Sequence, residues 1–234
     1  MIHEIKTACL VIGVEAKPEF VLTDFEQAII KAFTFHFPSV NMQGCHFHFC
    51  QCLWRNFVDN RGMKALYSTN VELKKWFKMS CSLAFIPVNK VEDCFEHLHD
   101  TEPDLPAVSL TPYLDYLAKT WIEGIYDLSL WNHFGNEGDR TNNPLEGFNL
   151  GLNKSVDIHS NIWKFISEIA NIECRHSIRY ERIENDTLHE RNRNKKDLVR
   201  DIDLLKAKNK YLQDNDIMTY WKEVSDLMPE FEEV

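Results

Sequence analysis

EFVLTDFEQAIIKAFTFHFP, residues 19–38, joins a short apolar run to a segment in which apolar residues recur at helical spacing. The run over residues 19–24 is typical of a buried strand that is covered on both faces. The segment after it predicts an amphipathic helix that ends at a proline, with apolar positions at Phe25, Ala28, Ile29, Ala32, Phe33 and Phe37. A second short strand is expected over residues 40–45, and a helix over residues 46–60. Strand, helix, strand and helix with short connections indicate an α/β core.

The rest of the chain has the pattern of a predominantly helical protein. Residues 2–12 indicate a short helix, and residues 61–139 predict an all-helical insertion with its own small core. A loop then leads to a helix that Pro144 opens and to a long amphipathic helix over residues 161–184. Beyond residue 185, a charged stretch and a last helix over residues 216–227 are expected to be peripheral.

We therefore expect an α/β remnant, predominantly helical, in four parts. Residues 1–60 would form a partial core, residues 61–139 the helical insertion, residues 140–190 two helices that complete the core, and residues 191–234 a charged helical tail. The 44% hydrophobic and 12% aromatic residues exclude global disorder, because they suffice for a sizeable core.

The sequence predicts neither a membrane span nor secretion. No run of 18 apolar residues is present, and the N-terminus lacks the basic region and cleavage site of a signal peptide. The seven cysteines are irregularly spaced, which favours free thiols in a reducing compartment over a disulfide framework.

Charge is distributed unevenly along the chain. The net charge of −10 argues against a nucleic-acid footprint over the whole surface. Between Arg175 and Lys210, however, eleven basic and seven acidic residues give a net charge of +4. Such a segment can contact phosphates, with Arg191, Arg193, Lys195 and Lys196 as the candidate contacts. The interleaved acids, however, favour a solvated surface helix.

Asp24 is the first candidate for chemistry, because it stands where the apolar strand gives way to the helix. Side chains at the carboxyl ends of strands in open α/β sheets face the functional crevice. A carboxylate there can hold a hard divalent cation such as Mg²⁺. The structural alternative is a helix N-cap, with Gln27 completing a capping box.

Glu146 has the same two interpretations. Asn143 can be the N-cap, Pro144 the first helical residue and Glu146 the third, an ordinary helix start. Glu146, Asn149 and Asn153 also share one polar face, which could line a metal or phosphate site.

Cys45 and His48, in the segment CHFHFCQC, raise the question of zinc. A structural zinc site needs four ligands, and no downstream pair has a suitable spacing. Zinc is therefore not expected, and buried cysteines with hydrogen-bonded histidines are the alternative.

The order of these motifs closely resembles the Mutator-like (MULE) transposase domain, over roughly residues 18–180. The matching pieces are VLTDFE at residues 21–26, GCHFH at residues 44–48, Trp131, and RTNNPLEGFN at residues 140–149. The likeness implies an RNase H-like core interrupted by a helical insertion. It makes Asp24 the second and Glu146 the third catalytic carboxylate of a DDE site, both as ligands of Mg²⁺ or Mn²⁺.

Further roles follow from the resemblance alone. Cys45 and His48 correspond to the family's C(2)H motif, and site-shaping roles fall to Arg140, Thr141, Asn142, Asn143 and Asn149. The family is encoded by transposable elements and cuts and rejoins DNA at terminal inverted repeats by metal-dependent, two-metal phosphoryl transfer. The resemblance implies a nuclear protein that binds DNA, with the cytoplasm as the alternative location. Homo-oligomerisation is left open.

The sequence departs from the family pattern upstream of Asp24. No aspartate occurs in the 23 residues before it, so the first metal-binding carboxylate, the first three strands and the DNA-binding zinc finger of the family have no counterpart. We therefore expect a fragment or decayed copy of a transposase that is inactive in DNA transposition. The alternatives are a domesticated DNA- or protein-binding module without catalysis, and a zinc-stabilised structural module.

Overall fold

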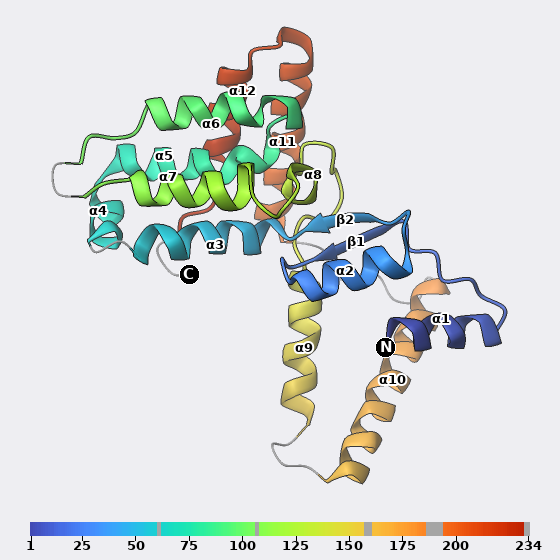
Figure 1. Ribbon diagram of the computed structural model, residues 1–234. Helices are drawn as coiled ribbons and strands as arrows, with labels where there is room; N and C mark the ends of the chain where they lie inside the picture. Colours follow the sequence, from blue (N-terminus) through green and yellow to red (C-terminus); the bar gives the residue numbers. More distant parts are fainter. Residues whose placement is uncertain (60–61, 106–107, 157–160, 186–193, 232–234) are drawn as a thin grey trace. The chain divides into compact units, whose positions relative to one another are not determined.

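The computed structural model describes residues 1–59, 62–105, 108–156, 161–185 and 194–231 (Figure 1). Its internal contacts divide the chain into two compact units. Unit 1 comprises Met1–Asn142 and Ile202–Val234, and unit 2 comprises Asn143–Asp201.

The sheet of unit 1 consists of two parallel strands, β1 (Phe20–Thr23) and β2 (Asn41–Gly44), joined by helix α2 (Gln27–His36). Phe20 pairs with Asn41 and Thr23 with Gly44, so the carboxyl ends of the strands are level. Helix α1 (Ile2–Val11) packs against α2, and Lys6 Nζ donates to the carbonyl of His36 at 2.8 Å. The predicted strand–helix–strand order is correct, but the expectation that both faces of β1 are covered is wrong, since Phe20 is 42% exposed.

A bundle of helices makes up the larger part of unit 1. Figure 1 shows its main helices side by side beyond the sheet, and most of the buried aromatic residues belong to it. The elements are α3 (His46–Asp59), α4 (Met63–Thr69), α5 (Val71–Ser82), the 3₁₀ turns Leu83–Phe85 and Val88–Lys90, α6 (Val91–Asp100), α7 (Thr111–Leu117), the π-helical turn Ala118–Ile122 and α8 (Leu128–Trp131). Helix α3 shares one core with the predicted insertion, so the insertion does not have a core of its own.

The C-terminal helices are part of this core and not peripheral as expected. Helix α12 (Ile217–Asp226) packs on α5, where Trp221 is fully buried and its Nε1 donates to the carbonyl of Met79 at 3.1 Å. Helix α11 (Lys195–Asp214) lies within the predicted charged helical tail, but the sequence predicts neither its bounds nor its burial. Its buried residues Leu204, Ala207 and Tyr211 recur at helical spacing, and the charged residues between them hide that pattern.

Unit 2 contains α9 (Asn143–Ser155), α10 (Ile162–Glu184) and the beginning of α11. Neither α9 nor α10 contains a buried residue. The rings of Phe148 and His176 meet at 5.5 Å between centroids and connect the two helices. The long amphipathic helix predicted over residues 161–184 is confirmed, and Asn161 caps it by accepting from the N–H of Lys164.

Candidate functional site at the carboxyl ends of the strands

Three motifs that are distant in sequence meet at the carboxyl ends of β1 and β2. The N–H of Cys45, directly after β2, donates to the carbonyl of Thr23 at 2.7 Å, which places Cys45 beside the beginning of the Asp24 loop. The N–H of His46 donates to the carbonyl of Arg140 at 2.8 Å. The strand-end aspartate, the Cys-x-x-His segment and the beginning of the RTNN segment are therefore joined by backbone hydrogen bonds.

Asp24 is half-buried and is not the N-cap of α2. Its Oδ1 accepts from the N–H of Glu26 at 3.0 Å, which closes a turn two residues long, and the helix begins only at Gln27. The predicted capping box is wrong, because Glu26 occupies the N-cap position and makes no side-chain cap bond.

Phe25 explains why the helix starts late. Its ring packs edge-on against Trp121 at 4.8 Å, and its carbonyl accepts from the hydroxyl of Tyr126 at 3.0 Å. A Cβ at position 44 would lie 2.4 Å from this ring, so the close approach requires Gly44. Phe25 is thereby anchored in the aromatic core, and helix α2 begins two residues later, at Gln27.

Cys45 and His48 lie on the same side of the start of α3, three residues apart. Cys45 is fully buried and His48 is half-buried. Among the described residues, no group of three or more His, Cys, Asp or Glu side chains is arranged to hold a metal ion.

The neighbouring His46 has sulfur and carbonyl contacts. Its Nε2 lies 3.3 Å from Cys50 Sγ and 3.4 Å from the carbonyl of Cys81. Burial raises the pKa of the Cys50 thiol well above its usual value, and contact with Cys81 adds to the effect. The buried thiol of Cys50 is held in its neutral form, and its contact with His46 fits a buried cysteine with a hydrogen-bonded histidine.

His133 secures the end of β2 and was not singled out in the sequence. Its Nε2 donates to the carbonyl of Gly44 at 2.9 Å, and its Nδ1 accepts from the side-chain amide of Asn136 at 3.2 Å. Both ring nitrogens are thus used by the neutral form. Burial lowers the pKa of His133 to about 4, and the nearby Arg140 also lowers it.

Buried amides strengthen the same junction. The side-chain amide of Gln43 donates to the carbonyls of Leu130 at 3.0 Å and Asn132 at 2.8 Å, and that of Asn132 donates to the carbonyl of Ile86 at 2.6 Å. Polar residues at such positions resemble loop residues in a sequence, and only their burial in the fold reveals the role.

The remaining predicted site residues divide between the two units. Arg140, Thr141 and Asn142 are half-buried in unit 1, with the Arg140 guanidinium 5.8 Å from the centre of the Phe85 ring. The other described candidates are exposed and belong to unit 2: Asn143, Glu146, Asn149, Lys195 and Lys196. Helix α9 starts at Asn143, one residue before the predicted start. Arg191 and Arg193 lie outside the described residues.

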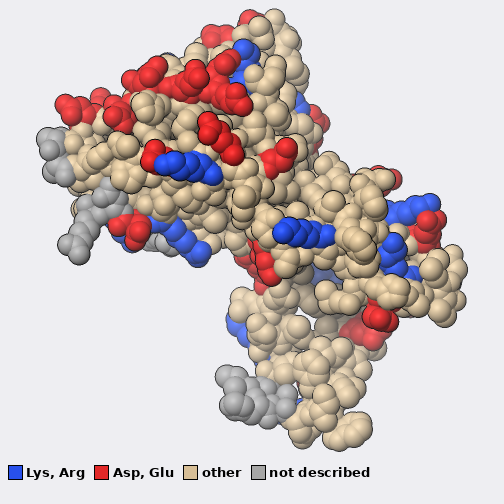
Figure 2. All heavy atoms as spheres, in the orientation of Figure 1, with Lys and Arg blue, Asp and Glu red and all other residues tan. Residues whose placement is uncertain are grey.

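The helical bundle carries acidic charge along the exposed side of α6. Figure 2 shows acidic side chains gathered on the face of unit 1 that includes α6, whose exposed acids are Glu92, Asp93, Glu96 and Asp100. Such a face repels a nucleic-acid backbone.

Comparison with known proteins gives one match. The model of the MULE transposase domain matches residues 1–52, a segment that includes β1, Asp24, β2, Cys45 and His48. No curated protein and no solved structure matches the chain. Among the described residues, no helix has both the length and the hydrophobicity of a membrane span. The N-terminal part of this chain, residues 1–52, is therefore similar to the MULE transposase domain.

Proposed function

We propose that this protein is a transposase-derived DNA-binding protein that keeps part of an RNase H-like core and does not cleave DNA on its own. The observation that carries the proposal is the convergence of Asp24, the Cys45–His48 segment and the RTNN segment at one edge of the sheet. Their sequence order is that of the MULE domain, and residues 1–52 match its model.

The topology around the two strands supports an RNase H-like ancestry. Parallel strands joined by a helix are the unit from which α/β sheets are built, and such strands are normally covered on both faces. Here β1 pairs with β2 along one edge and exposes Phe20. Both features suit a pair of strands that belongs to a larger sheet.

Strand cleavage by two metal ions requires several carboxylate oxygens around a pair of divalent cations. The residues that the resemblance assigns to this task in the chain are Asp24 and Glu146, and Asp24 Oδ1 already accepts a backbone hydrogen bond. Among the described residues no larger group of ligands is assembled. The residues present do not fit a magnesium or manganese pair, so we propose no metal-dependent step for this chain.

DNA binding is assigned to the more basic part of the chain. The segment from Arg175 to Lys210 has a net charge of +4, whereas the face of α6 is acidic. Lys195 and Lys196 are exposed at the start of α11. As in the family, terminal inverted repeats would be the natural target and the nucleus the place of action.

The test uses the full chain with two DNA probes. A labelled duplex should bind with an affinity that falls as salt rises, because phosphate contacts release counterions. Supercoiled plasmid incubated with Mg²⁺ or Mn²⁺ should show no nicking above the buffer control. Absence of duplex binding would refute the DNA-binding role.

Two matched variants distinguish nicking by this chain from nicking by a contaminating nuclease. Nicking that disappears in both Asp24→Asn and Glu146→Gln would show that the chain is an active nuclease and would overturn the non-catalytic part of the proposal. Nicking that both variants retain comes from another enzyme and leaves the chain without cleavage activity, as proposed.

A further inference from the structure

The polar side of α10 carries a row of basic side chains. At about 100° per residue, Lys164, Arg175, Arg179 and Arg182 fall within about 60° of one another around the helix axis. All four are exposed. The name Arg stripe is used below for Arg175, Arg179 and Arg182.

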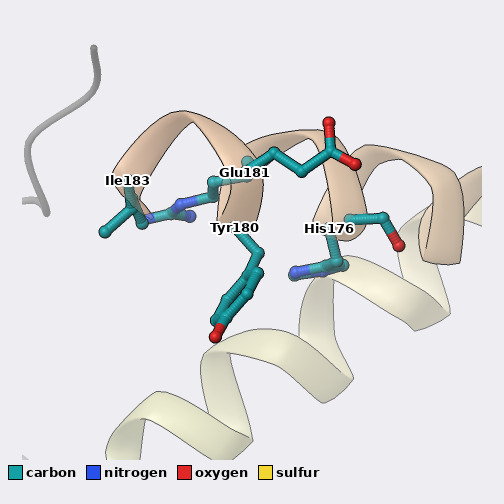
Figure 3. Close-up of a pocket in the computed structure, with 6 residues that line it drawn as sticks. His176, Tyr180, Glu181 and Ile183 are labelled. Carbon is teal, nitrogen blue, oxygen red and sulfur yellow. The ribbon is translucent and has the colours of Figure 1, made fainter. Parts of the chain in front are cut away.

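The acids of α10 are mostly on other sides of the helix. Glu168 lies within the same arc, whereas Glu173, Glu181 and Glu184 lie outside it. Figure 3 shows His176 and Tyr180 directed toward α9, with Glu181 on the opposite side of α10. An open pocket of about 570 Å³ is lined by residues of α10 that include Arg179, Tyr180 and Glu181.

Arg175 and Arg179 of the Arg stripe have no acid at the spacing that helical ion pairs need, whereas Arg182 is followed by Asp186 four residues later. The residues three and four positions from Arg175 and Arg179 are asparagine, isoleucine, histidine or another arginine. Among the described residues, Arg175 and Arg179 form no ion pair. Like charges at these spacings repel one another, so the arrangement differs from an ordinary solvated helix face.

We propose that the Arg stripe binds the sugar-phosphate backbone of duplex DNA, an inference that rests on the proposed DNA-binding function and locates it on α10. The stripe extends over about 10 Å of helix at about 1.5 Å per residue. One strand of a duplex presents a phosphate every 3.4 Å or so along its axis, so three arginines can reach successive phosphates.

The composition of the stripe favours a duplex over a single strand. Proteins that bind single strands interleave basic residues with aromatic rings on which bases stack. The aromatic residues Trp163 and Tyr180 of α10 lie outside the basic arc. Phosphate contacts without base contacts bind DNA with little dependence on its sequence.

The test is the salt dependence of duplex binding by the full chain, measured by fluorescence anisotropy. Replacing the three arginines in R175Q/R179Q/R182Q should reduce the slope of log affinity against log salt by about 2.7, since each phosphate contact contributes about 0.9. At about 0.1 M salt the affinity should fall by roughly 500-fold. The charge-preserving variant R175K/R179K/R182K should keep the slope.

A charge-matched control lies in unit 1. Lys31, Lys64 and Lys75 are exposed, and K31Q/K64Q/K75Q changes the net charge by the same amount. This control should keep the wild-type slope, and circular dichroism should show that every variant retains its helix content. Loss of slope in the control equal to that in the arginine variant would refute a contact at α10.

The outcomes distinguish this inference from the proposed function. If the wild-type protein binds duplex DNA and R175Q/R179Q/R182Q keeps the full salt slope, the DNA contact of the Arg stripe is refuted but the proposed function is not. Wild-type protein that binds no duplex refutes both. Tighter binding of a single strand of the same length, with the same dependence on the arginines, would show that the duplex assignment is wrong.

Discussion

Acidification should destabilise the protein through His133, the buried residue that secures the end of β2. The imidazole is only 2% exposed and its folded-state pKa is lowered to about 4, against an ordinary value of 6.5. Above pH 6.5 both folded and unfolded chains hold this residue neutral. Below it the unfolded chain takes up a proton that the folded chain does not, so the free energy of unfolding falls with pH.

The size of the effect follows from the two pKa values. A difference of 2.5 between 6.5 and about 4 corresponds to about 3 kcal/mol, lost progressively as the pH falls through that interval. The physical cause is that protonation of Nδ1 would place a charge in a buried site and replace the acceptor that Asn136 uses.

Urea denaturation at a series of pH values measures this contribution. His133→Gln keeps an amide that can donate to the carbonyl of Gly44 but cannot titrate. As the pH is lowered, the free energy of unfolding should therefore fall less steeply in His133→Gln than in the wild type, by up to about 1.4 kcal/mol per pH unit. His3→Gln, at an exposed position of α1, should behave like the wild type. Parallel curves for wild type and His133→Gln between pH 6.5 and 4 would refute the reasoning.

Two further predictions concern the core. Trp221→Ala should lower the free energy of unfolding by about 3–5 kcal/mol, because it empties a fully buried site and removes the hydrogen bond to the carbonyl of Met79. The control is Leu212→Ala, at a side chain that is 62% exposed, and it should change the free energy of unfolding by less than about 0.5 kcal/mol. An effect of Trp221→Ala as small as that of the control would show that α12 is not part of the core. Alkylation at neutral pH followed by mass spectrometry should label the exposed Cys174 and spare Cys50, whose thiol is buried with a raised pKa; equal labelling of both in the native protein would contradict the buried site.

The fold could be predicted where local pattern alone determines the structure. The strands, α2, α3 and α10 follow from apolar periodicity and from Pro38, and their bounds agree with the structure to within one or two residues. Helix α11 could not be recognised in the same way, because Leu204, Ala207 and Tyr211 are few among many charged residues. What makes it a core helix is tertiary burial, which no local pattern contains.

The candidate site shows the same division. The positions of Asp24 and Cys45 at strand ends could be predicted, since parallel strands align their carboxyl ends. The contributions of Gln43, Asn132 and His133 could not, because their partners are backbone carbonyls 46 to 89 residues away along the chain. Hydrogen bonds to backbone groups leave no sequence signature in the partner residue.

The structure also changes what has to be explained about Asp24. An N-cap would account for an acid at this position, because a carboxylate accepts hydrogen bonds from the first turn and interacts favourably with the helix dipole. Asp24 instead lies outside α2 and accepts one hydrogen bond from Glu26, which an asparagine could accept equally well. Burial raises the pKa of the Cys52 thiol on α3, and Cys50 and then Asp24 add smaller contributions. The hydrogen bond to Glu26 therefore requires an acceptor oxygen at position 24 but no negative charge.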